Sequence, residues 1–256
     1  MANPVVDAAR AALGPVGVCL PVSFTDNPHA DLQRAAAGRL EDAGYRAVWT
    51  NEVIGKDALV QLGMLLSATE RMAFGTCIAN IWARPAQTMH AAAAQLAQAY
   101  PGRFVLGLGV GYPEQAASVG RDFGSPLATM RDYVNRMDSP TWPSAPDAPY
   151  PKIIAANGPK MLALAGDIAD GALPAMLPAQ FTTQARRTLG PDKLLVVGVS
   201  VVGDPIDSAA IAAQVHEQLT AGADHVTLLP PIGIEFGSGI EQLERLAPAL
   251  AALPGR

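Results

Sequence analysis

Polar side chains that could move a proton or bind a ligand come directly after several apolar runs of the chain. Glu52 follows RAVWTN, Asn80 ends AFGTCIAN, and Tyr112 stands two residues beyond FVLGLGV. A carboxylate and a phenol can hold a proton, although a phenol releases it reluctantly at neutral pH, and an amide can hydrogen-bond a polar ligand. Whether these residues form one site depends on the elements that carry them.

The segment AANGPKML favours a phosphate site. The run KIIAAN predicts a strand that ends at Asn157, and Pro159 is typical of the first residue of a helix. Gly158 allows close approach, and the amides of Lys160 and Met161 come where a helix start has N–H groups without partners. The Lys160 side chain adds positive charge. We predict that residues 157–161 bind a phosphate group.

Eight short apolar runs alternate with alanine-rich stretches of helical spacing. The runs are nearly continuously apolar, as strands buried on both faces are, and prolines and glycines mark several helix ends. The alternation predicts an α/β fold, a closed (β/α)8 TIM barrel in one domain over residues 1–256. The predicted strands are 16–22, 46–51, 73–80, 104–110, 152–157, 171–177, 194–202 and 225–230, and the predicted helices are 31–44, 57–70, 85–100, 159–170, 208–222 and 240–252. Residues 111–126 are predicted to be a long loop, and the proline-rich residues 138–151 an extended linker within the domain.

The run RFVLGLGVGYPEQ places glycines at 107, 109 and 111. A dinucleotide fingerprint needs G-x-G-x-x-G between a strand and a helix, but position 112 is tyrosine, Pro113 follows, and the run is the fourth of eight. The glycines would instead let the backbone approach a flat ligand across the barrel mouth, or would relieve crowding inside the barrel. Both uses stay open.

Composition excludes several classes of protein. Half of the residues are apolar, 16% are charged and the net charge is −5, which argues against disorder and against a nucleic-acid partner. The N-terminal stretch is interrupted by Asp7 and Arg10, so we expect no signal peptide, no membrane span and a cytoplasmic protein. Cys19 and Cys77 are expected to be buried thiols. No spacing of possible ligands predicts a metal site.

Four segments carry a family resemblance: GYRAVWTNE, FGTCIANIWARPA, PGRFVLGLGVGY and AANGPKMLALAGDIADGA. They resemble the bacterial luciferase-like flavin and deazaflavin oxidoreductases, which are TIM barrels that bind FMN or coenzyme F420. The resemblance runs from about residue 16 to 177 and resumes over 207–230. IANIWARP and YPGRFVLGLGV are similar to the F420-dependent branch. The helical insertion that relatives usually carry after strand seven is missing, which would make the site shallower.

The resemblance also implies roles for residues at the mouth. An acidic residue at the position of Glu52 contacts the cofactor, and the next residue is often a histidine, where this chain has Val53. A non-prolyl cis peptide would join Cys77 to Ile78 behind the ring, and Asn80 could hydrogen-bond the ring or its polyol. Val110 and Tyr112 would face the cofactor, and Tyr112 stands where some relatives carry a glutamate proton donor.

These expectations combine into one leading hypothesis. The chain would be an oxidoreductase that moves a hydride between a small organic substrate and C5 of F420, with Glu52 and Tyr112 as catalytic candidates. An FMN-dependent monooxygenase and a cofactor-binding barrel without turnover stay open. A lyase with a Schiff-base lysine would need Lys56 or Lys160. The resemblance implies a homodimer. The substrate would contact residues 111–126, residues 138–151 and the region of Trp82 and Arg84, and Arg84 is expected to lie at the surface.

Overall fold

The strands close into a barrel, as predicted. The computed structural model describes residues 3–23, 25–53, 55–203 and 206–252. All strand pairings are parallel and follow the order β3-β2-β1-β9-β8-β7-β6-β5-β4, and β3 also pairs with β5, which completes the ring. β3 and β4 are two parts of one barrel strand, so the barrel has the eight predicted strands. Their bounds are β1 Val16–Cys19, β2 Ala47–Thr50, β3 Ala73–Thr76, β4 Ala79–Asn80, β5 Phe104–Gly109, β6 Lys152–Ala155, β7 Gly171–Leu173, β8 Leu194–Ser200 and β9 His225–Leu229.

The apolar sequence of the strands reflects burial on both faces. Every residue of β2, β3 and β5 is buried. Parallel strands of this kind face helices on the outside and barrel side chains on the inside, so neither face tolerates a regular polar alternation. This burial explains why the runs were recognisable in the sequence.

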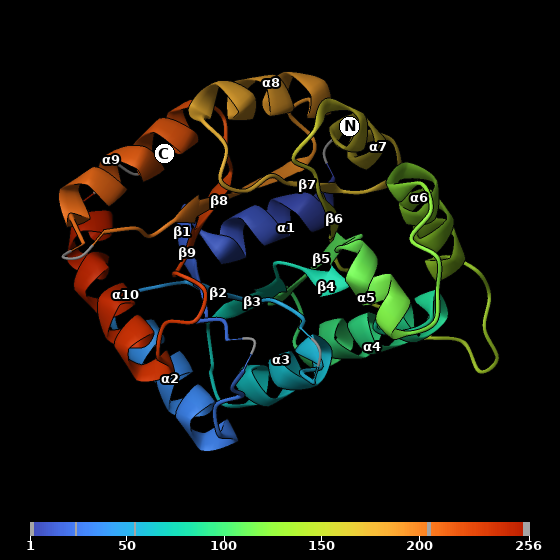
Figure 1. Ribbon diagram of the computed structural model, residues 1–256, viewed down its shortest axis with the longest axis horizontal. Helices are drawn as coiled ribbons and strands as arrows, with labels where there is room; N and C mark the ends of the chain where they lie inside the picture. The colour runs from blue at the N-terminus through green and yellow to red at the C-terminus, as the bar shows by residue number, and fades with distance from the viewer. Residues whose placement is uncertain (1–2, 24, 54, 204–205, 253–256) are drawn as a thin grey trace.

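Helices surround the strands in Figure 1. The six predicted helices are present, although α10 begins at Phe236, four residues before the predicted start. Within the described ranges, no helix combines the length and apolarity needed to cross a bilayer. The bounds are α1 Pro4–Leu13, α2 Ala30–Asp42, α3 Ala58–Ser67, α4 Ala86–Ala99, α5 Pro113–Ser118, α6 Pro126–Met137, α7 Pro159–Ile168, α8 Ala179–Leu189, α9 Ser208–Thr220 and α10 Phe236–Ala251.

Helix α1 was not predicted, and it closes the bottom of the barrel. Asn3 caps its first turn, with Oδ1 accepting a hydrogen bond from Val5 N at 3.2 Å. Val6, Ala9 and Leu13 are buried with residues at the starts of the strands, in a cluster inside the barrel. In Figure 1 this helix crosses the centre of the ring. A second, larger cluster lies between the strands and the outer helices.

Two connections differ in how well they were predicted. Residues 138–151 form no helix or strand, as expected of a proline-rich linker. The prediction of a long loop over 111–126 is wrong, because α5 occupies Pro113–Ser118. Pro113 begins this short helix, and the side chain of Gln115 accepts a hydrogen bond from Tyr112 N at 2.9 Å. A helix of this length has too few turns to show an apolar period.

β8 ends at Ser200 and α9 begins at Ser208, and the shortening of this region relative to relatives stays a prediction. Asp204 and Pro205 lie outside the described residues.

Candidate active site

The predicted site residues lie at the carboxyl ends of the barrel strands. Glu52 follows β2, Asn80 ends β4, Tyr112 follows β5, and Asn157 follows β6. The peptide bond between Cys77 and Ile78 is cis, which confirms that prediction. Ligands of TIM barrels bind at this end, so the topology places these residues around one possible site.

Glu52 is buried, with 6% of its surface exposed, and its carboxylate accepts hydrogen bonds from three residues. Oε1 accepts a hydrogen bond from Ala58 N at 3.0 Å, and Oε2 accepts one from Asn80 N at 2.8 Å. Both terminal nitrogens of Arg84 also donate to this carboxylate. Glu52 therefore joins the start of α3 to β4. Its predicted catalytic role stays a prediction, and this geometry favours a positioning role.

Arg84 was expected at the surface, and that expectation is wrong. Its side chain is 9% exposed and pairs with Glu52 and with Asp57, whose Oδ2 lies 2.8 Å from an Arg84 nitrogen. Burial by itself lowers the pKa of the guanidinium, but the hydrogen bonds and charges of the two carboxylates outweigh burial and raise it. The carbonyl of Arg84 also accepts a hydrogen bond from Tyr133 Oη at 3.0 Å. Nothing in the local sequence pairs residues 52 and 84.

Asn80 organises the adjoining turn. Its Oδ1 accepts a hydrogen bond from Trp82 N at 2.9 Å, and the side chain is almost fully buried. The Trp82 indole then donates to the carbonyl of Val110 at 2.8 Å, which connects the ends of β4 and β5. Glu52, Asn80 and Arg84 together form an ordered wall of the mouth, and the buried contacts of Asn80 orient it there. The half-buried Val110 stands at the rim.

The glycines of β5 relieve crowding inside the barrel. A Cβ at Gly107 would stand 2.0 Å from the carbonyl oxygen of Thr76, and a Cβ at Gly109 would stand 2.4 Å from Cγ1 of Ile78. Gly111 has a different use, because its φ of 60° is a left-handed conformation that favours glycine. Of the two readings left open, the structure supports crowding at 107 and 109.

Tyr112 stands apart from this wall. It is 71% exposed, and its hydroxyl has no hydrogen-bond partner among the described residues. The position at the rim after β5 leaves the phenol free to contact a ligand above the mouth.

The start of α7 leaves backbone donors free of side-chain caps. Gly158 is the N-cap residue, with no side-chain hydrogen bond to the first turn, and a Cβ built on it meets nothing within 4 Å. Lys160 is exposed and Met161 is half-buried, so their amides face a partly open surface. Asn157 instead supports the loop after β7, because its Oδ1 accepts a hydrogen bond from Ala175 N at 2.9 Å.

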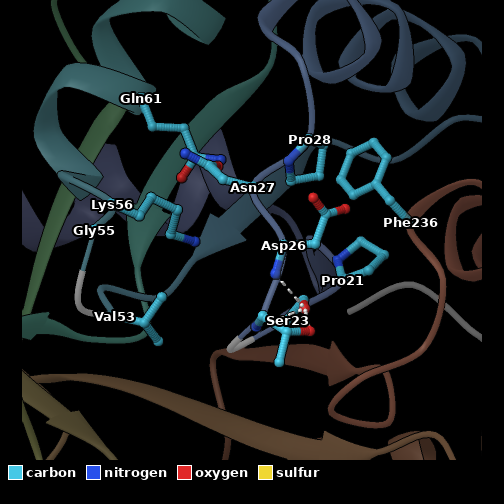
Figure 2. A pocket seen from close by; sticks show the side chains of 11 residues that line it. Pro21, Ser23, Asp26, Asn27, Pro28, Val53, Gly55, Lys56, Gln61 and Phe236 are labelled. Atoms are coloured by element: carbon cyan, nitrogen blue, oxygen red, sulfur yellow. Dashed lines mark hydrogen bonds between the residues drawn. The ribbon is translucent and has the colours of Figure 1, made fainter.

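Two neighbouring cavities open at the mouth. The larger, of about 530 Å³, lies between the loop after β2 on one side and the end of β4, the turn after it and α5 on the other. Its lining includes Glu52, Val53, Gly55, Lys56, Asp57, Asn80, Trp82 and Arg84. The second, of about 190 Å³, lies between the loop after β1, the loop after β2 and Phe236 (Figure 2). Val53, Gly55 and Lys56 line both cavities.

Lys56 was not among the predicted site residues, apart from the lyase alternative. Its Nζ donates to Asn51 Oδ1 at 2.9 Å and to Thr50 Oγ1 at 3.2 Å. Figure 2 shows the side chain reaching into the smaller cavity. Burial lowers the pKa of this ammonium below its ordinary value, and the nearby Cys19, Cys77 and Glu52 offset part of that shift. A loop lysine gives no sequence signal for such burial.

A family model described as luciferase-like monooxygenase matches residues 15–190 of the chain. A Mycobacterium tuberculosis protein, whose name assigns it provisionally to the coenzyme F420-dependent oxidoreductases, is 33% identical over 178 residues, or 57% of this chain and 50% of the relative. The 5,10-methylenetetrahydromethanopterin reductase of Methanolobus tindarius is 28% identical over 151 residues, or 52% of this chain and 46% of the relative. The chain thus spans about half the length of the curated relatives it matches.

The fold has a solved counterpart. The structure of an F420-dependent secondary alcohol dehydrogenase, in complex with an F420–acetone adduct, superposes with a TM-score of 0.75 over 92% of this chain and 98% of that chain. The sequence identity is 16%, so this likeness establishes the barrel architecture alone.

Proposed function

The chain belongs to the luciferase-like monooxygenase family, and from that premise we propose that it is an oxidoreductase that uses coenzyme F420 to transfer a hydride to or from a small organic substrate. The observation that carries the proposal is the make-up of the mouth, where a cavity of about 530 Å³ opens at the strand ends on one side and an uncapped helix start lies on the other. The preference for F420 rests on the names of the two curated relatives.

The residues at the mouth fit such a cofactor. Gly158 faces open space, and the first amides of α7, at the positive end of the helix dipole, suit a phosphate. The larger cavity is within the range of small-molecule sites. The half-buried Ile78 and the exposed Tyr112 offer apolar surface for a ring. When bound, the deazaflavin supplies the hydride chemistry at its C5 atom.

We assign the tail of the cofactor to residues 157–161 and its ring to the surface of Cys77, Ile78 and Val110. The amides of Lys160 and Met161 would bind the phosphate, and Asn157 would hold the neighbouring loop in place. This arrangement leaves the larger cavity beside the ring for the substrate. Trp82 and the exposed Val119 line that cavity, which suits a substrate with an apolar part.

Glu52 acts as a positioning residue in this proposal. Its four hydrogen bonds fix the end of β4 and the start of α3. Protonation of Glu52 would leave the buried Arg84 with Asp57 as its remaining carboxylate partner. Proton transfer falls to Lys56 or Tyr112. Lys56 is favoured because it lines both cavities and because burial lowers the pKa of its ammonium, which eases release of the proton.

A binding and turnover experiment tests the proposal. The full chain is mixed with F420 and, separately, with FMN, and absorbance and fluorescence titrations report binding. Reduction of bound F420 is then followed with simple secondary alcohols. We expect F420 to bind more tightly, and Lys56→Gln to lower the turnover rate by roughly 100-fold or more while Tyr112→Phe lowers it less.

Absence of any spectral change with both cofactors would contradict the proposal. An equal loss of turnover in the Lys56 and Tyr112 variants would remove the assignment of Lys56 while leaving the oxidoreductase function in place.

An FMN-dependent monooxygenase is the second candidate, and the description of the matching family favours it. Tighter binding of FMN than of F420, with oxygen consumption on reduction, would establish this alternative.

A barrel that binds a cofactor without turnover is the third candidate. Val53 stands where relatives often carry a histidine, and the short connection over 201–207 leaves this side of the mouth without an insertion. Tight F420 binding without oxidation of any alcohol, sugar phosphate or reduced pterin would favour it.

A further inference from the structure

Two thiols lie in contact beneath the mouth, and none of the steps proposed above uses their sulfur chemistry. Cys19 is the last residue of β1, and Cys77 follows β3 directly. Their Sγ atoms are 3.2 Å apart, although 58 positions separate them in the sequence. β1 and β3 both pair with β2, and the two side chains pack in the cluster inside the barrel.

The fold thus brings the two sulfurs into contact from strands on either side of β2, so forming a bond between them also requires the two strand ends to approach. A disulfide bond is about 2.0 Å long, so the sulfurs need to approach by roughly 1.2 Å, the difference from 3.2 Å. No other cysteine is present in the chain. We propose that Cys19 and Cys77 form a reversible dithiol–disulfide pair at the floor of the mouth, a modification site for oxidants of the peroxide class.

The two thiols differ in access. Cys19 is 3% exposed, whereas Cys77 is half-buried at the open end of the barrel. A small oxidant therefore reaches Cys77 first, and Cys19 stands in contact with it as the resolving thiol. The Lys56 ammonium lies near enough to lower the pKa of Cys77, although the hydrogen bond with Cys19 and burial outweigh it and raise that pKa overall. The first step is consequently slower than at an exposed thiol.

The chemistry balances with hydrogen peroxide as the oxidant. The Cys77 thiol takes one oxygen atom from peroxide, becomes a sulfenic acid and releases water. The Cys19 sulfur then attacks the Cys77 sulfur, and the S–S bond forms as the S–O bond breaks. The Cys19 proton leaves with the hydroxide as a second water. A dithiol such as dithiothreitol reverses the change by giving two electrons and two protons to the disulfide and becoming a disulfide itself.

The bond would connect the end of β1 to the residue before Ile78. The Ile78 side chain packs over Gly109, so the disulfide would brace the surface that we assign to the ring. This consequence rests on the proposed function, whereas formation of the disulfide does not.

Peroxide treatment of the full native chain tests the pair. After treatment, free thiols are alkylated in denaturant, and the chain is digested without reductant and analysed by mass spectrometry. We expect loss of both alkylatable thiols, a single cross-linked peptide pair containing Cys19 and Cys77 that is lighter by two hydrogen atoms, and full recovery of both thiols after dithiothreitol.

The variants Cys19→Ser and Cys77→Ser provide matched controls. In Cys19→Ser the sulfenic acid at Cys77 has no resolving thiol, so labelling by dimedone should exceed that of the unmodified chain by about tenfold or more. Equal labelling in both chains would overturn the proposal. So would a wild-type chain that keeps both thiols, or that carries sulfinic acid at Cys77 beside a free Cys19, and these two outcomes do not depend on how the variants fold.

Discussion

The two ends of the barrel are built in opposite ways. At the bottom, α1 covers the strand starts and the buried His225 bridges Trp49 and Gly14, with distances of 2.9 Å and 2.7 Å to its two ring nitrogens. At the mouth, large apolar side chains face solvent, with Tyr112 71%, Met176 68% and Ile232 66% exposed. One end is sealed and the other is left open.

This difference indicates that the bottom of the barrel contributes to stability and the mouth to ligand binding. The hydrogen bonds of His225 with Trp49 and Gly14 lie at the end of the barrel opposite the mouth. They can therefore hold the barrel closed without restricting a ligand. Within the mouth itself, the wall that includes Glu52, Asn80 and Arg84 has comparable buried pairing. The loops after β7 and β9 instead carry the exposed side chains of Met176 and Ile232, which a ligand could contact.

Removing the charge that holds the ordered wall should have the largest effect. Glu52→Ala leaves the buried Arg84 with Asp57 alone, and we expect the free energy of unfolding to fall by about 3–5 kcal/mol. Glu244→Ala is the matched control, since its pair with Arg39 is exposed and should cost less than about 1 kcal/mol. Denaturant titration measures both. Equal losses would show that the buried pair of Glu52 and Arg84 stabilises the fold no more than the exposed pair of Glu244 and Arg39.

The bottom should respond to acid, with a somewhat smaller effect. Trp49 Nε1 donates to His225 Nε2, so this nitrogen carries no proton, while Nδ1 donates to the Gly14 carbonyl. Burial lowers the pKa of His225 to about 4, against opposing effects of Gly14 and Asp224. Between pH 6.5 and pH 4 the unfolded chain therefore binds the extra proton, and stability falls by roughly 3 kcal/mol as the pH drops through this window.

Unfolding curves at several pH values check this prediction. His225→Phe removes the titrating group, so its stability should change less over the same window than that of the unmodified chain. A parallel decline in both chains would contradict the role of His225 and assign the acid sensitivity to other groups.

The contrast also explains which elements the sequence revealed. Strands buried on both faces carry continuous apolar runs, so all eight were predictable. Helix α1 was missed because it lies outside the strand–helix alternation, although Asn3 and Pro4 mark its start. The short α5 has too few turns to show an apolar period, whereas α6 and α8 were missed although both are amphipathic.

The features of the site also divide into those that the sequence could predict and those that it could not. The cis bond at Cys77 and the features at 157–161 could be inferred, the first from family resemblance and the second from helix-start chemistry. The partners of Glu52 could not, since Arg84 reaches it from a separate loop. The contact between Cys19 and Cys77 also needed the barrel, because it crosses an intervening strand.

A diffraction structure of the chain with F420 is the measurement that tests the central claim most directly. We predict electron density for the ring against Ile78 and a phosphate within hydrogen-bonding distance of the amides of Lys160 or Met161. Density for the ring elsewhere, or a phosphate distant from α7, would contradict the account.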